Sequence, residues 1–146
     1  MKSIIIAFIA LGAVADFAAA ASAQERPYDN GPVWNIASVQ TKPGHFDDYM
    51  KFVSHTWRAE QEALKAAGYV IDYKVFTTVD ARDNEPNLVL AVEWKNMGAL
   101  DMPLDQRDSM TKKFFGSIEG ASKANVDRET IRTMRGSTMF RQLILK

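Results

Sequence analysis

The junction formed by residues 41–46, Thr-Lys-Pro-Gly-His-Phe, constrains the fold of this chain most strongly. Before it, residues 33–40 alternate between two faces, as in a β-strand. After it, apolar residues recur at three- and four-residue steps over 45–67, as in an amphipathic helix. Pro43 and Gly44 supply the turn between the two periods. The junction therefore predicts a strand that runs directly into a long helix with one apolar stripe.

The first 23 residues have the pattern of a secretory signal peptide. Lys2 provides the positive start, an apolar run follows over 4–14, and Ala21-Ser22-Ala23 is a small-x-small cleavage site. The apolar run is shorter than the ~20 residues that a membrane-spanning helix needs. We therefore expect cleavage after Ala23, a periplasmic or secreted protein, and no membrane association once the signal is removed. A retained membrane anchor is the alternative.

The remaining chain has the size of one domain. Segment 24–32 contains two prolines and an Asn-Gly pair and is predicted to be a linker, which leaves 33–146 as the domain. Further alternating segments predict strands over 70–78, 88–94 and 137–145. A helical region is expected over 102–125, where Gly116 and Gly120 can divide it in two, and Asp127 is expected to cap a short helix that ends at Gly136.

The predicted order is strand, helix, strand, strand, helix, strand. This is the βαββαβ pattern of the ferredoxin-like class, an α+β fold with a four-stranded antiparallel sheet and helices on one face. Equal numbers of basic and acidic residues, 18 each, with no basic cluster among aromatics, argue against nucleic-acid binding. The absence of cysteine excludes thiol catalysis and cysteine-based metal sites. The two histidines are placed too differently to form a metal pair, so we expect no metal and no cofactor.

Alternation sorts the strand residues into two faces. The first is apolar and aromatic, and we expect the helices to cover it: Trp34, Ile36, Ile71, Tyr73, Val75, Leu88, Leu90, Val92, Trp94, Phe140 and Ile144. The second mixes apolar and charged residues: Ala37, Val39, Val89, Ala91, Leu143, Asp72, Lys74, Glu93 and Arg141. Such a face is too apolar for water and too charged for an ordinary core, so we expect it to pack on its own copy in a homodimer. A solvated sheet face is the alternative.

Three segments carry a resemblance to a known family: Val-Gln-Thr-Lys-Pro-Gly at 39–44, Asp-Tyr-Lys-Val at 72–75 and Val-Glu-Trp-Lys-Asn at 92–96. With the predicted element order, the chain resembles the dimeric α/β-barrel superfamily, and most closely its exported bacterial members of unassigned function. The resemblance implies two ferredoxin-like subunits that pair their sheets into a barrel. The superfamily includes cofactor-independent oxygenases, haem-degrading enzymes and members with no known chemistry, so the resemblance implies no particular reaction.

The haem-degrading branch of that superfamily needs an Asn on the first strand, a Trp on the second helix and a His beyond it. Asn35 matches the first requirement. The second helical region contains no Trp, however, and no His follows His55. Haem chemistry is therefore not expected. His55 itself falls on the charged stripe of the first helix, which faces solvent.

The candidate functional residues are mostly aromatic. Core packing explains them as well, but the functional interpretation is a small-molecule pocket between helix and sheet. Its expected lining is Trp34, Ser38, Trp57, Tyr73, Trp94 and Gln142. Tyr73 and His45 are the candidate catalytic residues. Arg132, Arg135 and Arg141 could hold an anionic group or form surface ion pairs.

The sequence leaves three functions open. The first is an exported dimer that binds a small apolar or aromatic molecule. The second is a cofactor-independent monooxygenase or lyase-like enzyme, and the third is a structural dimer without a ligand. No acid–base pair or nucleophile stands out in the sequence, which favours the binding protein.

Overall fold

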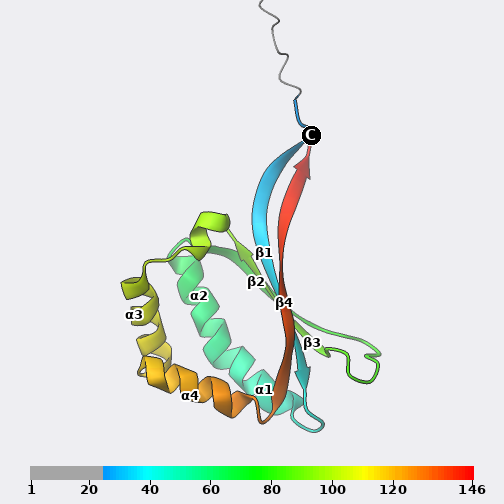
Figure 1. The fold of residues 1–146 in the computed structure, drawn as a ribbon, viewed down its shortest axis with the longest axis vertical. Coiled ribbons are helices and arrows are strands. Elements are labelled where there is room, and N and C mark those ends of the chain that lie inside the picture. Colours follow the sequence, from blue (N-terminus) through cyan, green and yellow to red (C-terminus); the bar gives the residue numbers. More distant parts are fainter. Residues whose placement is uncertain (1–24) are drawn as a thin grey trace, which may run out of the picture.

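The computed structural model describes residues 25–146, so the predicted signal peptide, 1–23, lies outside the described residues. The elements follow the predicted order (Figure 1). They are β1 (Tyr28–Thr41), α1 (Phe46–Phe52), a turn of π-helix η1 (Val53–Trp57), α2 (Arg58–Ala66), β2 (Val70–Thr77), β3 (Leu88–Trp94), a 3₁₀ turn η2 (Met97–Leu100), α3 (Leu104–Phe115), α4 (Ile118–Arg128) and β4 (Arg132–Leu145).

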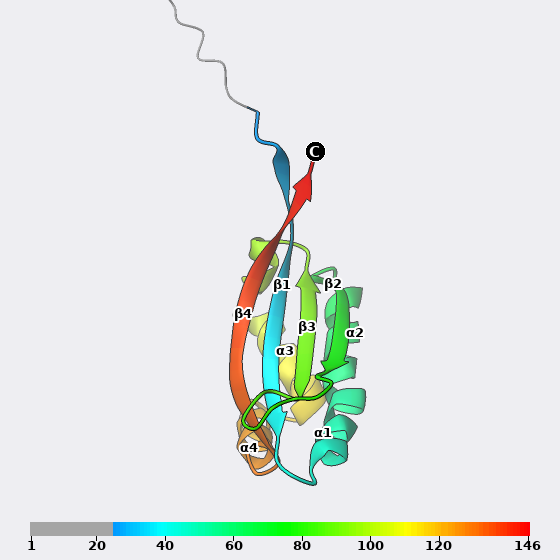
Figure 2. The same ribbon diagram turned by 90° about the vertical axis from the view of Figure 1, so that its right-hand side faces the viewer.

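The four strands form one antiparallel sheet in the order β2-β3-β1-β4. All the helices lie on one side of it, and the opposite face is bare (Figures 1 and 2). This is the ferredoxin-like α+β arrangement, which confirms the fold predicted from the element order. At one end, β1 and β4 continue beyond the other two strands as a two-stranded ribbon (Figure 1).

The predicted junction is confirmed in detail. The backbone N–H of His45 donates to the carbonyl of Lys42 over 3.0 Å, and Gly44 has φ +81°, a conformation that favours glycine. The turn starts a helix that continues through α1, η1 and α2 to Ala66. Asp47 and Asp48 occupy its first turn, where the helix dipole favours negative charge.

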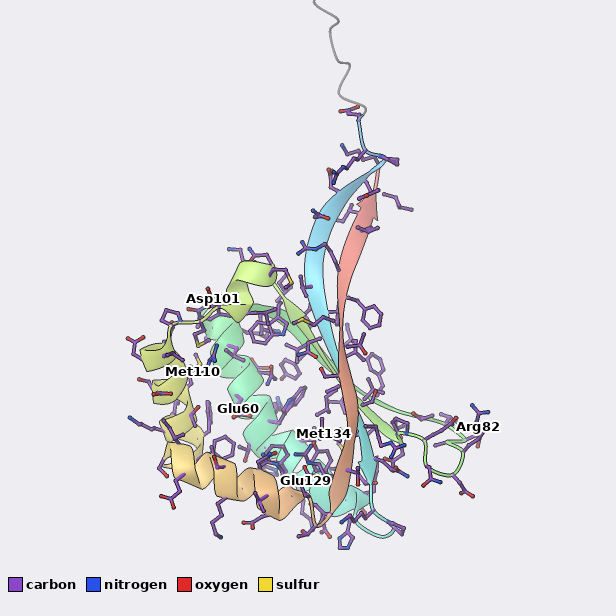
Figure 3. All side chains as sticks on the ribbon, in the orientation of Figure 1. Glu60, Arg82, Asp101, Met110, Glu129 and Met134 are labelled. Carbon is purple, nitrogen blue, oxygen red and sulfur yellow. The ribbon has the colours of Figure 1, made fainter. Side chains whose placement is uncertain are left out.

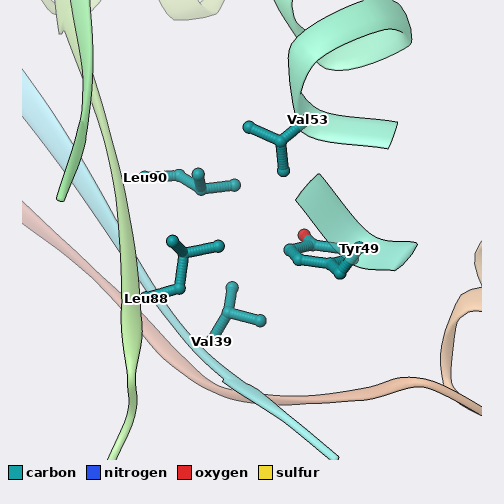
Figure 4. Close-up of a cluster of buried hydrophobic side chains, with 5 residues drawn as sticks. All are labelled: Val39, Tyr49, Val53, Leu88 and Leu90. Atoms are coloured by element: carbon teal, nitrogen blue, oxygen red, sulfur yellow. The ribbon is translucent and has the colours of Figure 1, made fainter. Parts of the chain in front are cut away.

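The main core cluster lies where this helix crosses the sheet (Figure 4). Tyr49 and Val53 point from the helix onto side chains of β1 and β3, and the five members are all at least 95% buried: Val39, Tyr49, Val53, Leu88 and Leu90. Each such side chain contributes about 1.5–3 kcal/mol by leaving water. The cluster therefore fixes the position of the first helix on the sheet.

The second helical region is two helices, as Gly116 suggested. The α3 helix ends there because Gly116 adopts φ +76°, and Ser117 then caps α4 by accepting a hydrogen bond from the Gly120 N–H at 2.8 Å. Gly120 is needed for a different reason. A Cβ atom at this position would lie 2.4 Å from the backbone oxygen of Phe115.

Two predicted segments were wrong. The expected linker over 24–32 contains the start of β1, because Tyr28 pairs with Leu145 and a bulge between Asn30 and Val33 accommodates Gly31 and Pro32. Proline is tolerated here because this part of β1 has a strand on one side only.

The short helix expected from Asp127 to Arg135, closed by Gly136, is not formed. Asp127 belongs to the last turn of α4, and the chain enters β4 at Arg132, where Gly136 lies beside a bulge. The residue pattern after Asp127 resembles a helix start, but pairing with β1 determines the structure of this segment.

The two sheet faces were predicted correctly for β3 and most of β2 and wrongly for β1 and β4. In β2, Ile71 lies at a bulge and is 48% exposed, and Val70, which pairs with Trp94, takes the helix-side position instead. Trp34 pairs with Glu93 and Phe140, and cross-strand partners share a face. Trp34, Ile36 and Phe140 therefore lie on the bare face. By the same rule the helices cover the other face of β1, which carries Asn35, Ala37 and Val39. Arg141 of β4 pairs with Val33 and therefore lies on this helix-covered face as well. The phase of β1 is decided by the small side chains that fit beneath the first helix, whereas the larger aromatics had suggested the opposite.

We predict that Gly120→Ala lowers the free energy of unfolding by about 1–3 kcal/mol, because the new methyl group meets backbone atoms that cannot rotate away. This outcome opposes intrinsic helix propensity, which favours Ala over Gly by roughly 1 kcal/mol. Urea unfolding followed by circular dichroism measures the change. The exposed Ser122→Ala on the same helix is the control, and a stabilised Gly120→Ala would contradict the packing described here.

Candidate functional site

A cavity of about 410 Å³ lies between the helices and the sheet. Strands β1, β3 and β4 form one wall, and α1, η1 and α2 form the other. The ends of α3 and α4 close one side. Its lining is Asn35, Ala37, Tyr49, Phe52, Trp57, Glu60, Gln61, Leu64, Leu90, Val92, Trp94, Phe115, Ala121, Arg128, Arg132 and Met134. Figure 3 shows Glu60 on α2 and Met134 on β4, which belong to the two walls.

A second cavity of about 260 Å³ adjoins the first, between α2 and α3. The two share one boundary, formed by Glu60, Gln61, Leu64 and Trp94. The rest of the second cavity is mainly apolar: Ala99, Leu100, Met102, Arg107, Met110, Thr111 and Phe114. The chain thus contains an elongated apolar space with Glu60 and Gln61 near its middle.

Four polar atoms on this lining are buried without a hydrogen-bond partner. They are Gln61 Oε1, Trp94 Nε1, Arg128 Nε and Arg132 Nε. Gln61 is only 7% exposed. An unpaired buried polar group costs about 1–3 kcal/mol. Four such atoms gather on residues that line one cavity, and because each atom is itself almost inaccessible, a ligand could bond to them only after neighbouring side chains shift.

Two arginines lie at the end of the cavity formed by α4 and β4. Arg132, with its side chain 6% exposed, donates from Nη2 to Asn125 Oδ1 at 2.9 Å and lies 3.2 Å from Glu129 Oε1. The guanidinium of Arg128 stacks over the ring of Phe52 at 4.1 Å. Burial and the positive charge of Arg132 both lower the pKa of Arg128. The two cations are thus close enough to repel each other.

Glu60 is the only carboxyl group on the lining of either cavity. Burial raises the pKa of Glu60, and the positive charge of Arg128 opposes that shift. A carboxyl group that is easier to protonate than usual can accept or donate a hydrogen bond to a ligand, or exchange a proton with it.

The π-helical turn η1 brings Trp57 to the cavity. It adds one residue to the turn over Val53–Trp57, and such insertions occur frequently at functional sites. The Trp57 ring meets Tyr73 edge-on, with centroids 5.4 Å apart at 90°. Trp57 therefore forms part of the cavity wall and is supported from behind by the sheet.

The structure brings together only part of the predicted pocket. Trp57 and Trp94 line the first cavity. Tyr73 packs behind Trp57, and its hydroxyl donates to Glu62, which raises the pKa of Tyr73. Trp34 and Ser38 lie on the bare face, since their strand has the opposite phase, and Gln142 lies beside Gly31 on the β1–β4 ribbon.

The histidines lie outside both cavities. His45 is at the start of α1, with Nδ1 3.2 Å from Asp48 Oδ2. His55 is exposed, as expected, and borders an open groove between α2 and α3. Within residues 25–146, no group of three or more acidic, histidine or cysteine side chains is placed to hold a metal ion. None of the helices in this range is long and apolar enough to cross a membrane.

The functional candidates that sequence reasoning missed are Glu60, Gln61 and Arg128. A signal for the first two exists in the sequence. The apolar stripe of the first helix passes from Trp57 to Leu64, and Glu60 and Gln61 are the polar residues that interrupt it at helical spacing. Arg128 has no comparable signal, because its position depends on how α4 packs.

No protein-family model and no curated protein matches this sequence. Solved structures do match. HapK from Hahella chejuensis aligns with a TM-score of 0.51 and 10% identity, covering 75% of this chain and 91% of HapK. A conserved protein from Methanosarcina mazei Go1 (18% identity, 77% and 91% coverage) and a dimeric ferredoxin-like protein from an uncultured marine organism (13%, 79% and 97%) both have TM-scores of 0.47. The chain shares its fold with HapK, and at this identity the likeness concerns the fold alone.

We predict that Gln61→Met raises the free energy of unfolding by about 1 kcal/mol, because it removes an unpaired buried oxygen and conserves side-chain length. Gln106→Met is the matched control. Its Oε1 accepts from the Tyr69 hydroxyl at 2.7 Å, so the same substitution there should cost about 1 kcal/mol. Both are measured by chemical denaturation. A loss of stability in Gln61→Met would mean that this amide has a structural role.

Proposed function

We propose that this chain forms a homodimer in which each subunit binds a small, largely apolar or aromatic molecule between the helices and the sheet. The observation that carries the proposal is the cavity of about 410 Å³ with four unpaired buried polar atoms on its lining and its immediate extension. Small-molecule sites usually have volumes of roughly 300–1,000 Å³ and mainly apolar walls with a few convergent polar groups.

The walls of the cavity support an aromatic or flat ligand. Tyr49, Phe52, Trp57, Trp94 and Phe115 surround it from three directions. Aromatic rings pair favourably in stacked or edge-on arrangements, which contribute about 0.5–1.5 kcal/mol beyond the buried area. A ligand with one or two rings would gain from several of these contacts at once.

The homodimer is proposed from the bare side of the sheet. This face carries apolar side chains in a continuous arrangement: Trp34, Ile36, Phe76, Val89, Ala91 and Phe140. Phe76 and Phe140 are 49% and 54% exposed in the single chain. Exposed patches of this kind mark interaction sites.

The β1–β4 ribbon indicates that the occupant is a second copy. A two-stranded ribbon is marginally stable in water unless it packs on something. Its end carries exposed Leu143, Ile144 and Leu145, and it continues directly from the bare face. Two-fold pairing places the same surface of each subunit on the other, so one contact would cover both faces and both ribbons.

Export remains a separate proposal. It rests on residues 1–23, which have the charge, apolar run and small residues of a cleavable signal peptide. The cavity and the dimer contact are formed by residues after Ala23 and do not depend on it.

The neutral aromatic dye phenylnaphthylamine tests the cavity. We expect the protein to bind it with increased dye fluorescence, and Ala121→Phe to weaken binding roughly tenfold because the ring fills part of the cavity. Val126→Phe places the same ring at an exposed position of the same helix and should leave binding unchanged. If Ala121→Phe binds the dye as well as the wild type, the cavity is not the binding site. Native mass spectrometry of protein from its natural host then identifies any resident ligand.

Light scattering tests the dimer. We expect the wild type to be dimeric at micromolar concentration and Phe140→Glu to shift it to a folded monomer. Removing a central aromatic contact at an interface raises Kd by about thirtyfold or more. Val79→Glu changes an exposed residue of the β2–β3 loop and should remain dimeric. A monomeric wild type, or an unaffected Phe140→Glu dimer, would contradict the proposed contact.

A further inference from the structure

The two arginines at the α4–β4 end of the cavity indicate the chemical class of its ligand. Arg128 and Arg132 both line the cavity, and the Nε atom of each is buried without a partner. An arginine Nε–H and the neighbouring Nη–H form a planar fork that matches the two oxygens of a carboxylate. The cavity therefore has on its lining two groups of the kind that carboxylates bind.

The neighbouring groups use only part of this set of donors. Asn125 and Glu129 both contact Nη2 of Arg132, the nitrogen beside its Nε–H, and Glu129 is exposed. Within the described residues Arg128 forms no ion pair within 4 Å, and Glu60 reaches it only as a more distant charge. Two buried cations that repel each other are costly to hold together unless an anion lies between or beside them.

The charges around the cavity leave Arg128 without a close anion. Its lining contains two arginines and Glu60, and Glu129 lies 3.2 Å from Arg132, so among the described residues only Arg128 of the two arginines has no ion pair. A single carboxylate would supply that partner. The aromatic walls described above then select a flat apolar body attached to that carboxylate.

We propose that the cavity binds small aromatic carboxylates of one or two rings, with the carboxylate held by the guanidinium groups of Arg128 and Arg132. The ring system lies among Phe52, Trp57 and Phe115, and the adjoining apolar cavity accepts any substituent that extends beyond Glu60. This inference rests on the proposed function, because it names the ligand class of the same cavity.

Naphthoate and its uncharged amide, naphthamide, test the proposal on the intact mature protein. The two probes have almost the same shape and differ in charge. By isothermal titration, we expect the wild type to bind naphthoate roughly ten- to a hundred-fold more tightly, the usual range for hydrogen bonds to a charged group. Arg128→Gln should remove this preference, so that the affinity for naphthoate falls to about that for naphthamide.

Arg128 is the residue to change first, because the Arg132 guanidinium also holds Asn125 and Glu129 and its loss would disturb the turn before β4. Arg128→Lys keeps the positive charge without the planar fork and should retain only part of the preference. Arg135→Gln is the matched control, since Arg135 lies in the same region of β4, is exposed and lines neither cavity.

The outcomes separate this proposal from the cavity proposal. Equal affinities for naphthoate and naphthamide, or binding of phenylnaphthylamine without binding of naphthoate, would overturn the carboxylate site while leaving the apolar cavity supported. A preference for naphthoate that Arg135→Gln abolishes as fully as Arg128→Gln would also overturn it. Failure of all three probes to bind would contradict both proposals.

Discussion

The packing of the first helix on β1 and β3 is the contact on which the rest of the structure depends. Tyr49 and Val53 fill the space above Val39, Leu88 and Leu90, and this cluster sets the height and direction of the helix over the sheet. The helix continues beyond the cluster through the π turn, and the α3–α4 segment packs outside it. Because the close contact lies at one end, the helix and sheet are separated farther along by the side chains of Trp57, Glu60 and Gln61. The cavity is thus a consequence of where the tight packing ends.

This arrangement has a cost that packing alone does not offset. A cavity forfeits the van der Waals contacts that its lining would otherwise make, and each unpaired polar atom adds the free energy of its lost hydration. An apolar residue at position 61 or 128 would avoid part of that cost. The π turn and the neighbouring buried guanidinium groups add to it. These costly features lie together around one cavity. Such clustering is expected of a binding site, where residues chosen for function make the protein less stable than a fully packed core would.

The sequence predicted the architecture because the relevant signals are local. The Pro43-Gly44 turn, the apolar stripe of the first helix and the break at Gly116 each act within a few residues, and all three are confirmed. The β1 and β4 faces were wrong because alternation has two possible phases, and both contain apolar residues in β1. Only the register between strands decides which phase faces the helices, and a one-residue shift exchanges the two faces. A bulge near Gly136 complicates this further in β4.

The same physical reason limits the prediction of the site. Trp57 and Trp94 could be placed because they lie on elements whose phase was assigned correctly. Trp34 and Ser38 were assigned to the pocket because the faces of β1 were predicted the wrong way round. Pro32 suggested a linker, although β1 begins before it, at Tyr28. Glu60 and Gln61 were readable as polar interruptions of an apolar stripe. Arg128 and Arg132 come together only through the turn between α4 and β4, which replaced the helix expected after Asp127.

The phase of β1 also separates the two proposed functions in space. Asn35 and Ala37 face the cavity, while their neighbours Trp34 and Ile36 face the bare side where a second subunit would pack. The cavity lining described above comes from a single chain. The cavity and the bare face are connected through β1, because any shift of this strand moves the side chains on both of its faces together. A ligand that pushes on Ala37 would therefore change the surface presented to the partner, and dimer formation would in turn restrict how far the cavity can widen.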